Sequence, residues 1–128
     1  MNILLIEDEA TDMKLLSAVL NSSGHRVLQK DSAEQAVAEI KAHRPDLVLL
    51  DLKLPGMDGL ELARRLKQDP VTRRIPIVAM TAASEKFSMN DALAAGCDAY
   101  ILKPIDTRAL PNKIEEVARH KSRRRRKS

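Results

Sequence analysis

Short apolar segments alternate with amphipathic segments along the whole chain. The four apolar residues 3–6 form a run too short for a helix and flanked by polar residues, which is typical of a strand buried on both faces. Comparable segments predict further strands at residues 27–28, 47–50, 75–80 and 99–102. Between the strands, apolar residues recur at the three- and four-residue spacing of a helix.

Capping and turn residues indicate where these helices begin. Ser32 and Gln35 form a capping box for the second helix, and a third helix is expected at about residues 59–68. A fourth helix is expected to carry Phe87 on its apolar face, and a fifth to have Pro111 in its first turn. Strands that alternate with helices predict an α/β fold, with a doubly wound parallel sheet of five strands and helices on both faces.

The composition fits one globular domain. The chain has 128 residues, of which 44% are apolar and 31% are charged. No apolar run approaches the roughly 20 residues that a membrane-spanning helix needs, and no signal peptide is evident. A cytoplasmic protein is therefore expected. Cys97 is the only cysteine and is expected to be a small buried residue.

The net charge of +4 comes from one end of the chain. Residues 119–128 contain seven cations and no acid, so the remaining 15 cations and 18 acids give residues 1–118 a net charge of −3. We expect a domain at residues 1–120 and a basic, disordered tail at residues 121–128. The tail is typical of a solvated helix end, although nonspecific contact with polyanions is an alternative. The scarcity of aromatic residues argues against stacking platforms for single-stranded nucleic acid, and no specific nucleic acid is expected as a partner.

Polar residues follow four of the predicted strands. Glu7 and Asp8 come after the first strand, Asp51 after the third, Thr81 after the fourth and Lys103 after the fifth. In parallel sheets of this class the ligand site lies at the carboxyl ends of the strands, so these side chains should converge. Three carboxylates placed together repel one another, and a hard divalent cation such as Mg²⁺ would relieve this repulsion. With one lysine and Mg²⁺ the site would be neutral and able to receive a phosphoryl group.

A carboxylate in such a site can act as a nucleophile toward phosphorus and form an aspartyl phosphate. The metal and Lys103 would neutralise the charge on the phosphoryl oxygens during transfer, and the hydroxyl of Thr81 could hydrogen-bond the product. Each residue taken alone is weak evidence, because a single acid at a strand end is often only a turn former. The occurrence of these residues together at the ends of four strands is what indicates a site.

The sequence resembles the receiver domain of two-component response regulators, the CheY-like family. The similarity is carried by "ILLIEDE" at 3–9, "LVLLDLKLPGMDGLEL" at 47–62, "IPIVAMTA" at 75–82 and "GCDAYILKPI" at 96–105. These segments cover most of the chain in the expected order. The resemblance implies a flavodoxin-like fold with strand order 2-1-3-4-5. It also implies a signalling switch rather than an enzyme, with self-catalysed phosphotransfer and autodephosphorylation as its only chemistry.

The resemblance implies roles for the acidic residues. Asp51 would be the phosphoacceptor and would receive its phosphoryl group from a phosphohistidine of a sensor kinase or a histidine phosphotransfer protein. Glu7, Asp8 and Asp51 would hold Mg²⁺ together with the backbone carbonyl of Lys53, and Mn²⁺ is a substitute. Glu7 departs from the family's pattern, in which the first acid is more usually Asp.

The resemblance further implies how the signal would leave the site. Lys103 would pair with the phosphoryl group, and its peptide bond to Pro104 is expected to be cis. Thr81 would move toward the phosphoryl group beside the small Ala82, and Tyr100 would turn inward in concert. This would alter the face formed by the fourth helix, fifth strand and fifth helix, where an unknown downstream protein would bind. We expect a stand-alone receiver, although an excised receiver of a longer regulator would have a similar sequence.

Two other classes of protein remain as alternatives. Small Mg²⁺-dependent phosphohydrolases also use an aspartate nucleophile, but they resemble one another in a second Asp two residues later. That position is Lys53 here, so the residue that carries the proton is missing. A polyanion-binding module that acts through the basic tail would leave the strand-end residues unexplained.

Overall fold

The predicted alternation of strands and helices is confirmed. The structure, a computed structural model, describes residues 1–54, 56–82 and 89–127, and for residues 122–127 it describes the backbone alone. Phe87 lies outside the described residues. The elements are β1 (Asn2–Ile6), α1 (Ala10–Ser22), β2 (Arg26–Lys30), α2 (Ala33–His43), β3 (Leu47–Asp51), α3 (Gly59–Gln68), β4 (Ile77–Ala82), α4 (Met89–Ala94), β5 (Ala99–Lys103) and α5 (Leu110–Lys127).

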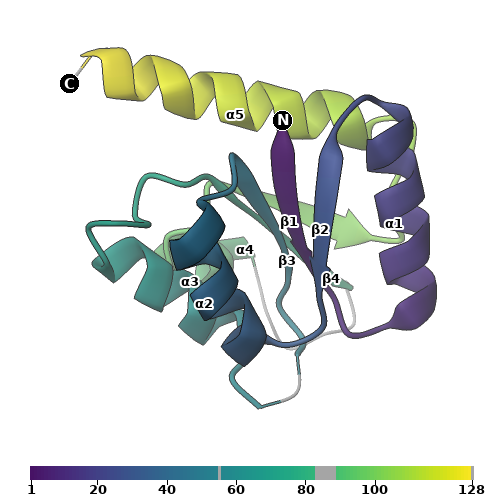
Figure 1. Ribbon diagram of the computed structural model, residues 1–128, viewed down its shortest axis with the longest axis horizontal. Coiled ribbons are helices and arrows are strands. Elements are labelled where there is room, and N and C mark those ends of the chain that lie inside the picture. Colours follow the sequence, from purple (N-terminus) through teal and green to yellow (C-terminus); the bar gives the residue numbers. More distant parts are fainter. Residues whose placement is uncertain (55, 83–88, 128) are drawn as a thin grey trace.

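The strands form one parallel sheet in the order β2-β1-β3-β4-β5, as the resemblance implied (Figure 1). Residues Ile6 of β1 and Leu50 of β3 are partners in the register, so both strands end at the same level. Every strand runs in the same direction, which places the carboxyl ends of all the strands at one edge of the sheet.

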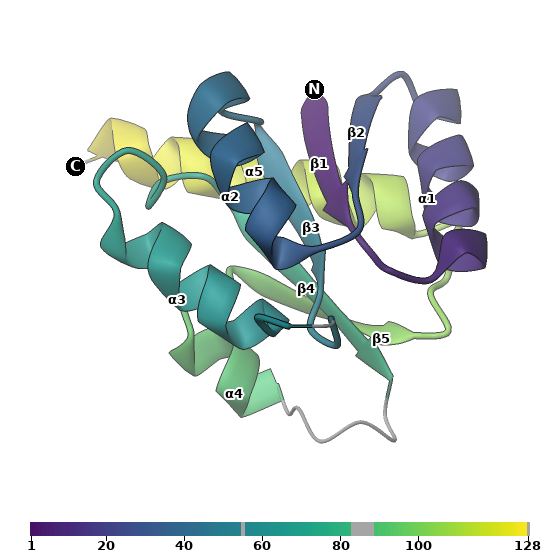
Figure 2. The same cartoon turned by 60° about the horizontal axis from the view of Figure 1, so that its bottom comes forward.

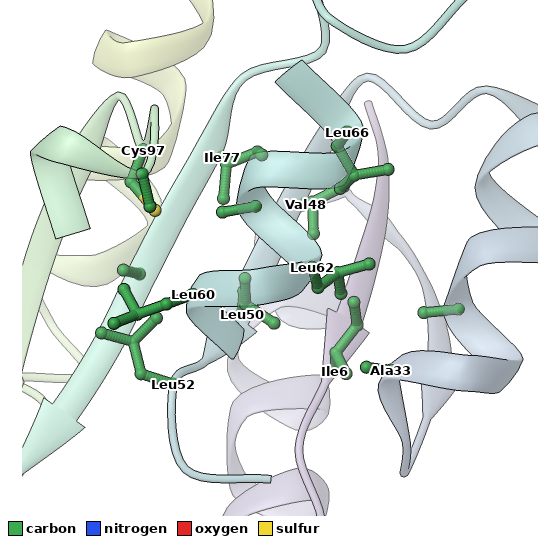
Figure 3. Close-up of a cluster of buried hydrophobic side chains, with 14 of the residues drawn as sticks. Ile6, Ala33, Val48, Leu50, Leu52, Leu60, Leu62, Leu66, Ile77 and Cys97 are labelled. Carbon is green, nitrogen blue, oxygen red and sulfur yellow. The ribbon is translucent and has the colours of Figure 1, made fainter. Parts of the chain in front are cut away.

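Helices cover both faces of the sheet, which explains why the central strands are apolar on both sides (Figures 1 and 2). One buried cluster lies between the sheet and helices α2, α3 and α4, and includes Leu50, Leu62 and Ile77 (Figure 3). The other includes Leu5, Leu16 and Ile114 and lies between the sheet and helices α1 and α5. Cys97 is buried in the first cluster, as expected.

The strand boundaries differ slightly from the predicted ones. β4 begins at Ile77 rather than at residue 75, and it continues through Thr81 and Ala82. Pro76 lacks the N–H group that a ladder position requires, although its carbonyl accepts a hydrogen bond from Val48 at 2.9 Å. Because β4 includes Thr81, that side chain is held by the sheet.

The last helix, α5, continues into the basic segment at residues 121–127, and the expected disorder of the tail stays a prediction. α5 continues to Lys127, because the segment after Pro111 contains no further proline or glycine and is rich in arginine and lysine, which favour helix. Lys121 is attached to the domain, since its Nζ lies 3.1 Å from Oδ1 of Asp98. Among the described residues, no helix is both long enough and apolar enough to cross a bilayer.

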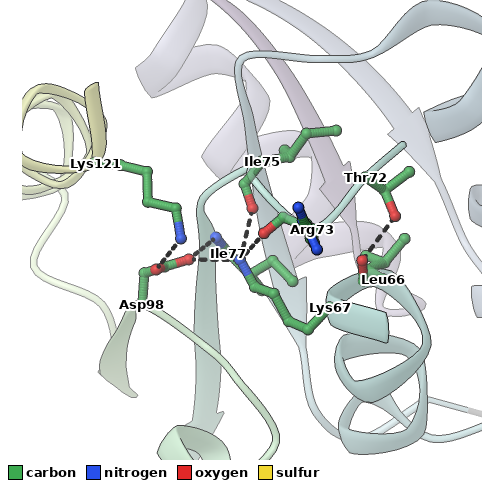
Figure 4. A network of polar contacts seen from close by, with 8 residues as sticks. All are labelled: Leu66, Lys67, Thr72, Arg73, Ile75, Ile77, Asp98 and Lys121. Carbon is green, nitrogen blue, oxygen red and sulfur yellow. Dashed lines mark hydrogen bonds and ion pairs between the residues drawn. The ribbon is translucent and has the colours of Figure 1, made fainter. Parts of the chain in front are cut away.

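A polar network joins several elements at the amino-terminal edge of the sheet (Figure 4). Lys67 of α3 donates hydrogen bonds to two backbone carbonyls of the loop before β4, at 3.1 and 2.9 Å, and to Oδ2 of Asp98 at 3.1 Å. The same oxygen accepts from the backbone N–H of Ile77 at 2.8 Å. With the bond from Lys121, Asp98 therefore connects α3, β4 and α5.

Candidate functional site

The acidic residues converge at the carboxyl edge of the sheet. β1 delivers Glu7 and Asp8, and Asp51 is the last residue of the neighbouring strand β3. Carboxylate oxygens of the three residues lie within 4.8 Å of one another. Glu7 and Asp51 are only 1% and 4% exposed, whereas Asp8 is exposed to solvent. The convergence expected from the sequence is thus observed.

Lys103, the last residue of β5, reaches across the sheet edge to these acids. Its Nζ lies 2.8 Å from Oδ2 of Asp51 and 2.9 Å from Oε2 of Glu7. The peptide bond between Lys103 and Pro104 is cis, as expected from the resemblance.

Asp12 is a site residue that the sequence did not suggest. Its Oδ2 lies 3.3 Å from Nζ of Lys103, so it is a further acidic partner of that lysine. Asp12 belongs to the first turn of α1, and only its position soon after the acids that follow β1 could have drawn attention to it. Acidic residues are common in the first turn of a helix, so this position alone was no functional signal.

Burial and crowding shift the pKa values in the site. Burial, reinforced by the neighbouring Asp51, raises the pKa of Glu7 from 4.5 to about 7. Burial also opposes the charge of Lys103, but hydrogen bonds and electrostatic attraction from Asp51 and Glu7 outweigh it and raise the pKa of Lys103. Lys103 therefore stays charged and holds together carboxylates that would otherwise repel one another.

Thr81 is placed beside this group with its hydroxyl unused. The residue is 1% exposed, and its Oγ1 has no hydrogen-bond partner among the residues that the structure describes. Ala82 is the partner of Lys103 in the register, and both line a cavity of about 350 Å³ next to Asp12 and Pro104. A buried hydroxyl without a partner costs free energy, so it is suited to a ligand that supplies an acceptor.

Tyr100 lies on β5 away from the acids. It is half-buried and packs against the cluster under α2, α3 and α4, on the same face of the sheet as Thr81 because alternate residues share a face. The described contacts do not bring Tyr100 into the acidic site. Its inward movement stays a prediction.

The turn after β3 is shaped around Asp51. The backbone N–H of Lys53 donates a hydrogen bond to Oδ1 of Asp51 at 2.9 Å. Gly59, the first residue of α3, has no room for a side chain, because a Cβ atom there would lie 2.7 Å from the carbonyl oxygen of Asp51. The close approach of α3 to the acceptor strand thus explains this glycine.

The donor set fits Mg²⁺. Hard cations prefer oxygen ligands, and Mg²⁺ binds through a small number of carboxylates while keeping several positions for water or phosphate oxygens. Oxygens of Glu7, Asp8 and Asp51 are close enough to share one ion, and the exposure of Asp8 leaves the site open to solvent. Because the acids at this edge outnumber Lys103, whose ammonium contacts Glu7 and Asp51, the arrangement attracts a further cation.

Comparison with known proteins agrees with this geometry. Residues 3–115 match the model of the response regulator receiver domain. The phosphate regulon transcriptional regulatory protein PhoB of Pseudomonas aeruginosa is 41% identical over 91% of this chain and 51% of its own length. The polar-differentiation response regulator DivK of Brucella anthropi is 35% identical over 91% of this chain and 92% of its own length. The chain thus spans about half the length of PhoB.

Solved structures show the same fold. The receiver domain of the sensor histidine kinase PA1611 from Pseudomonas aeruginosa has a TM-score of 0.84 at 32% identity, covering 91% of this chain and 96% of its own, and holds magnesium in its active-site cleft. A two-component response regulator from Clostridium difficile has a TM-score of 0.84 at 29% identity, covering 93% and 96% of the two chains.

The fold and the acidic site are those of a receiver domain of two-component systems. This chain belongs to the response regulator receiver domain family.

Proposed function

We propose that Asp51 accepts a phosphoryl group from a phosphohistidine of a sensor histidine kinase or a histidine phosphotransfer protein. The observation that carries this proposal is the position of Lys103 Nζ, which lies 2.8 Å from Asp51 and 2.9 Å from Glu7 at a cluster of carboxylates. A buried acid whose charge is balanced by a fixed lysine is poised for nucleophilic attack on phosphorus.

The transfer moves one phosphoryl group between two protein side chains. A carboxylate oxygen of Asp51 forms a bond to phosphorus while the bond from phosphorus to the donor's imidazole nitrogen breaks. The electron pair of the broken bond stays on that nitrogen, which then takes up a proton. Lys103 keeps its contact with the site and neutralises part of the charge on the phosphoryl oxygens.

Mg²⁺ would be held by Glu7, Asp8, Asp51 and the backbone carbonyl of Lys53, and it would supply positive charge to the phosphoryl oxygens. Mn²⁺ would substitute, because it accepts the same oxygen ligands. The N–H of Lys53 donates a hydrogen bond to Asp51, so the backbone of Lys53 lies next to the proposed acceptor.

The signal would leave through Thr81 and Tyr100. The hydroxyl of Thr81 gains an acceptor when Asp51 carries a phosphoryl group, so β4 and its neighbour β5 adjust together. Tyr100 shares the sheet face of Thr81 and would turn inward with it.

A downstream protein would read this change on the face formed by α4, β5 and α5. Met89 and Leu93 of α4 and Leu102 of β5 are 54%, 48% and 50% exposed, which gives this face large apolar side chains for a partner to cover.

Phosphorylation by a small donor tests the proposal. The protein is incubated with acetyl phosphate and Mg²⁺, and intact mass spectrometry measures the fraction that carries one base-labile phosphoryl group. We expect a single adduct that depends on Mg²⁺ or Mn²⁺ and is absent from Asp51→Asn. Asp46→Asn is the matched control, because it removes one exposed acid that directly precedes β3, at the opposite end of that strand from Asp51.

The proposal is wrong if no adduct forms with either metal while the protein remains folded by circular dichroism. Rapid turnover of unrelated phosphate esters would instead favour the phosphohydrolase alternative.

A further inference from the structure

A cavity of about 580 Å³ lies at the amino-terminal edge of the sheet, opposite the acidic site. The turn after α2 contributes Arg44 and the loop before β4 contributes Arg74, while α5 contributes Arg119. Three segments that are distant in the sequence therefore bring one arginine each to the same cavity.

The three guanidinium groups have no partner of their own in the described part of the chain. All three arginines are exposed, and no hydrogen bond or ion pair of their side chains occurs among the residues that the structure describes. The only acid in the lining is Asp46, whose Oδ2 already accepts a hydrogen bond from the backbone N–H of Asn2 at 2.7 Å. The cavity is thus strongly positive.

This concentration of positive charge contrasts with the domain as a whole, because residues 1–118, which include Arg44 and Arg74, carry a net charge of −3. The remaining lining is largely apolar and includes Pro45, Pro70, Val71, Ile75, Pro76 and Ala118. Val71 is 49% exposed. A cavity with a largely apolar lining and a few charged groups is typical of sites for small amphipathic ligands.

The backbone of Arg44 supplies a separate observation. Arg44 ends α2 in the left-handed conformation, with φ 41° and ψ 72°, and it is the only residue other than glycine with positive φ in the described ranges. Glycine or asparagine usually occupies this position, because a larger side chain costs about 1 kcal/mol there. The cap itself does not need arginine, which points to a role for the side chain.

We propose that this cavity binds a phosphate-bearing ligand with at least two negative charges, whose apolar part packs against the proline-rich lining. Arginine suits phosphate better than lysine does, since its planar fork donates two parallel hydrogen bonds to a pair of oxygens. The phosphate can belong to a free small molecule or to the headgroup of an anionic lipid. The proposal goes beyond the proposed phosphotransfer and does not depend on it.

A titration of the full chain tests the proposal. The ¹⁵N-labelled protein is titrated with sodium pyrophosphate at low salt without Mg²⁺, and amide chemical shifts are followed by NMR. We expect the largest shifts at residues 44, 46, 71, 74 and 119, and small shifts at residues 7, 8 and 51. Sedimentation with vesicles of phosphatidylglycerol and phosphatidylcholine, against phosphatidylcholine alone, tests the lipid source.

Variants distinguish binding in the cavity from nonspecific attraction to positive charge on the protein. The double variant R44Q/R74Q should weaken binding at least about tenfold, because the loss of one charge-assisted hydrogen bond alone raises the dissociation constant by about that factor. The matched double variant K14Q/R64Q removes two exposed cations from α1 and α3 and should leave binding unchanged. Truncation after Lys121 removes the basic end of α5 but keeps the lining and the bond between Lys121 and Asp98, and it should weaken binding less than about threefold.

Arg44→Gly tests whether weaker binding results from loss of the side chain or from destabilisation of the fold. Glycine adopts the backbone of residue 44 without a steric cost, so this variant should melt at the same or a higher temperature and still bind pyrophosphate more weakly.

Binding of pyrophosphate that R44Q/R74Q loses and K14Q/R64Q keeps supports a free phosphate ligand. The same pattern with anionic vesicles alone supports a lipid headgroup. The proposal is overturned if K14Q/R64Q weakens binding as much as R44Q/R74Q does, or if the truncated chain loses as much affinity. It is also overturned if the protein binds neither pyrophosphate nor anionic vesicles.

Discussion

Two polar networks lie at opposite ends of the same sheet, and they differ in how far their groups are satisfied. At the carboxyl edge, Lys103 faces the carboxylates of Glu7, Asp51 and Asp12, with Asp8 beside them. Acids outnumber cations there, and the hydroxyl of Thr81 has no partner in the described ranges. This network is incomplete until a cation and an acceptor arrive.

At the amino edge, the hydrogen-bonding groups of the network around Asp98 are satisfied. Asp98 accepts from Lys67, Lys121 and the N–H of Ile77, and the ammonium of Lys67 uses all its donors when its bonds to two carbonyls are included. Burial lowers the pKa of Lys67, whereas for Asp98 the hydrogen bonds from Ile77 and the lysines outweigh burial and lower its pKa. A satisfied network stabilises the fold, and an unsatisfied one is available for chemistry.

The largest effect on stability is expected at the satisfied network. Asp98→Asn leaves Lys67, whose side chain is only 16% exposed, without its charged partner, so the free energy of unfolding should fall by about 3 kcal/mol. Urea denaturation measures this change. Asp46→Asn, which also alters an acid that accepts a backbone N–H, is the control and should cost much less. An equal loss in both variants would show that the ion pairs of Asp98 contribute nothing.

Removal of Lys103 from the unsatisfied network should lower stability, and Mg²⁺ should reverse most of this loss. Lys103→Met leaves Glu7 and Asp51 without their shared cation, and the free energy of unfolding should fall by about 2 kcal/mol in the absence of metal. Mg²⁺ should restore most of this loss, because it supplies the missing positive charge. Lys14→Met on the exposed face of α1 is the control.

Thermal unfolding with and without Mg²⁺ measures the restoration. Asp98→Asn should gain no more from Mg²⁺ than the unaltered protein does. If Mg²⁺ raised the melting temperatures of Asp98→Asn and Lys103→Met equally, the carboxyl-edge network would not be the one that lacks a cation.

The two networks should also respond differently to pH. The pKa of Glu7 is raised to about 7 in the folded protein, so the folded state binds this proton more tightly than the unfolded state does. Without metal, the free energy of unfolding should therefore fall as pH rises from about 4.5 to 7, by about 1 kcal/mol or more. Glu7→Gln should remove this slope.

The pKa of Asp98 is lowered, so its contribution is present above the ordinary value of 3.8 and is lost only below it. Asp98→Asn should therefore keep the slope between pH 5 and pH 7 that Glu7→Gln removes, as measured by melting temperatures across that range. A slope unchanged in Glu7→Gln would assign the titration to another group.

The smallest effect is expected for the unused hydroxyl. Thr81→Val replaces a buried group that has no partner among the described residues, so the free energy of unfolding should stay the same or rise by up to about 1 kcal/mol. Urea denaturation measures stability, and the phosphorylated fraction of the variant is followed alongside it. A loss of more than 1 kcal/mol would show that the hydroxyl is bonded in the folded protein.

The sequence predicted the site better than it predicted the edges of the elements. Glu7, Asp8, Asp51 and Lys103 were found because each follows an apolar segment, and parallel strands must end together. The start of β4 was placed two residues early, because Ile75 and Pro76 are apolar whether or not they pair.

The sequence by itself determined the alternation of strands and helices, the parallel sheet and the acids at its carboxyl edge, because periodicity and strand ends are local properties of the chain. Only the tertiary structure decided which charges meet. Asp12 joins Lys103 across 91 positions of sequence, and Asp98 joins both Lys67 and Lys121. Arg44, Arg74 and Arg119 line one cavity for the same reason, since contacts between distant segments depend on how helices pack against the sheet.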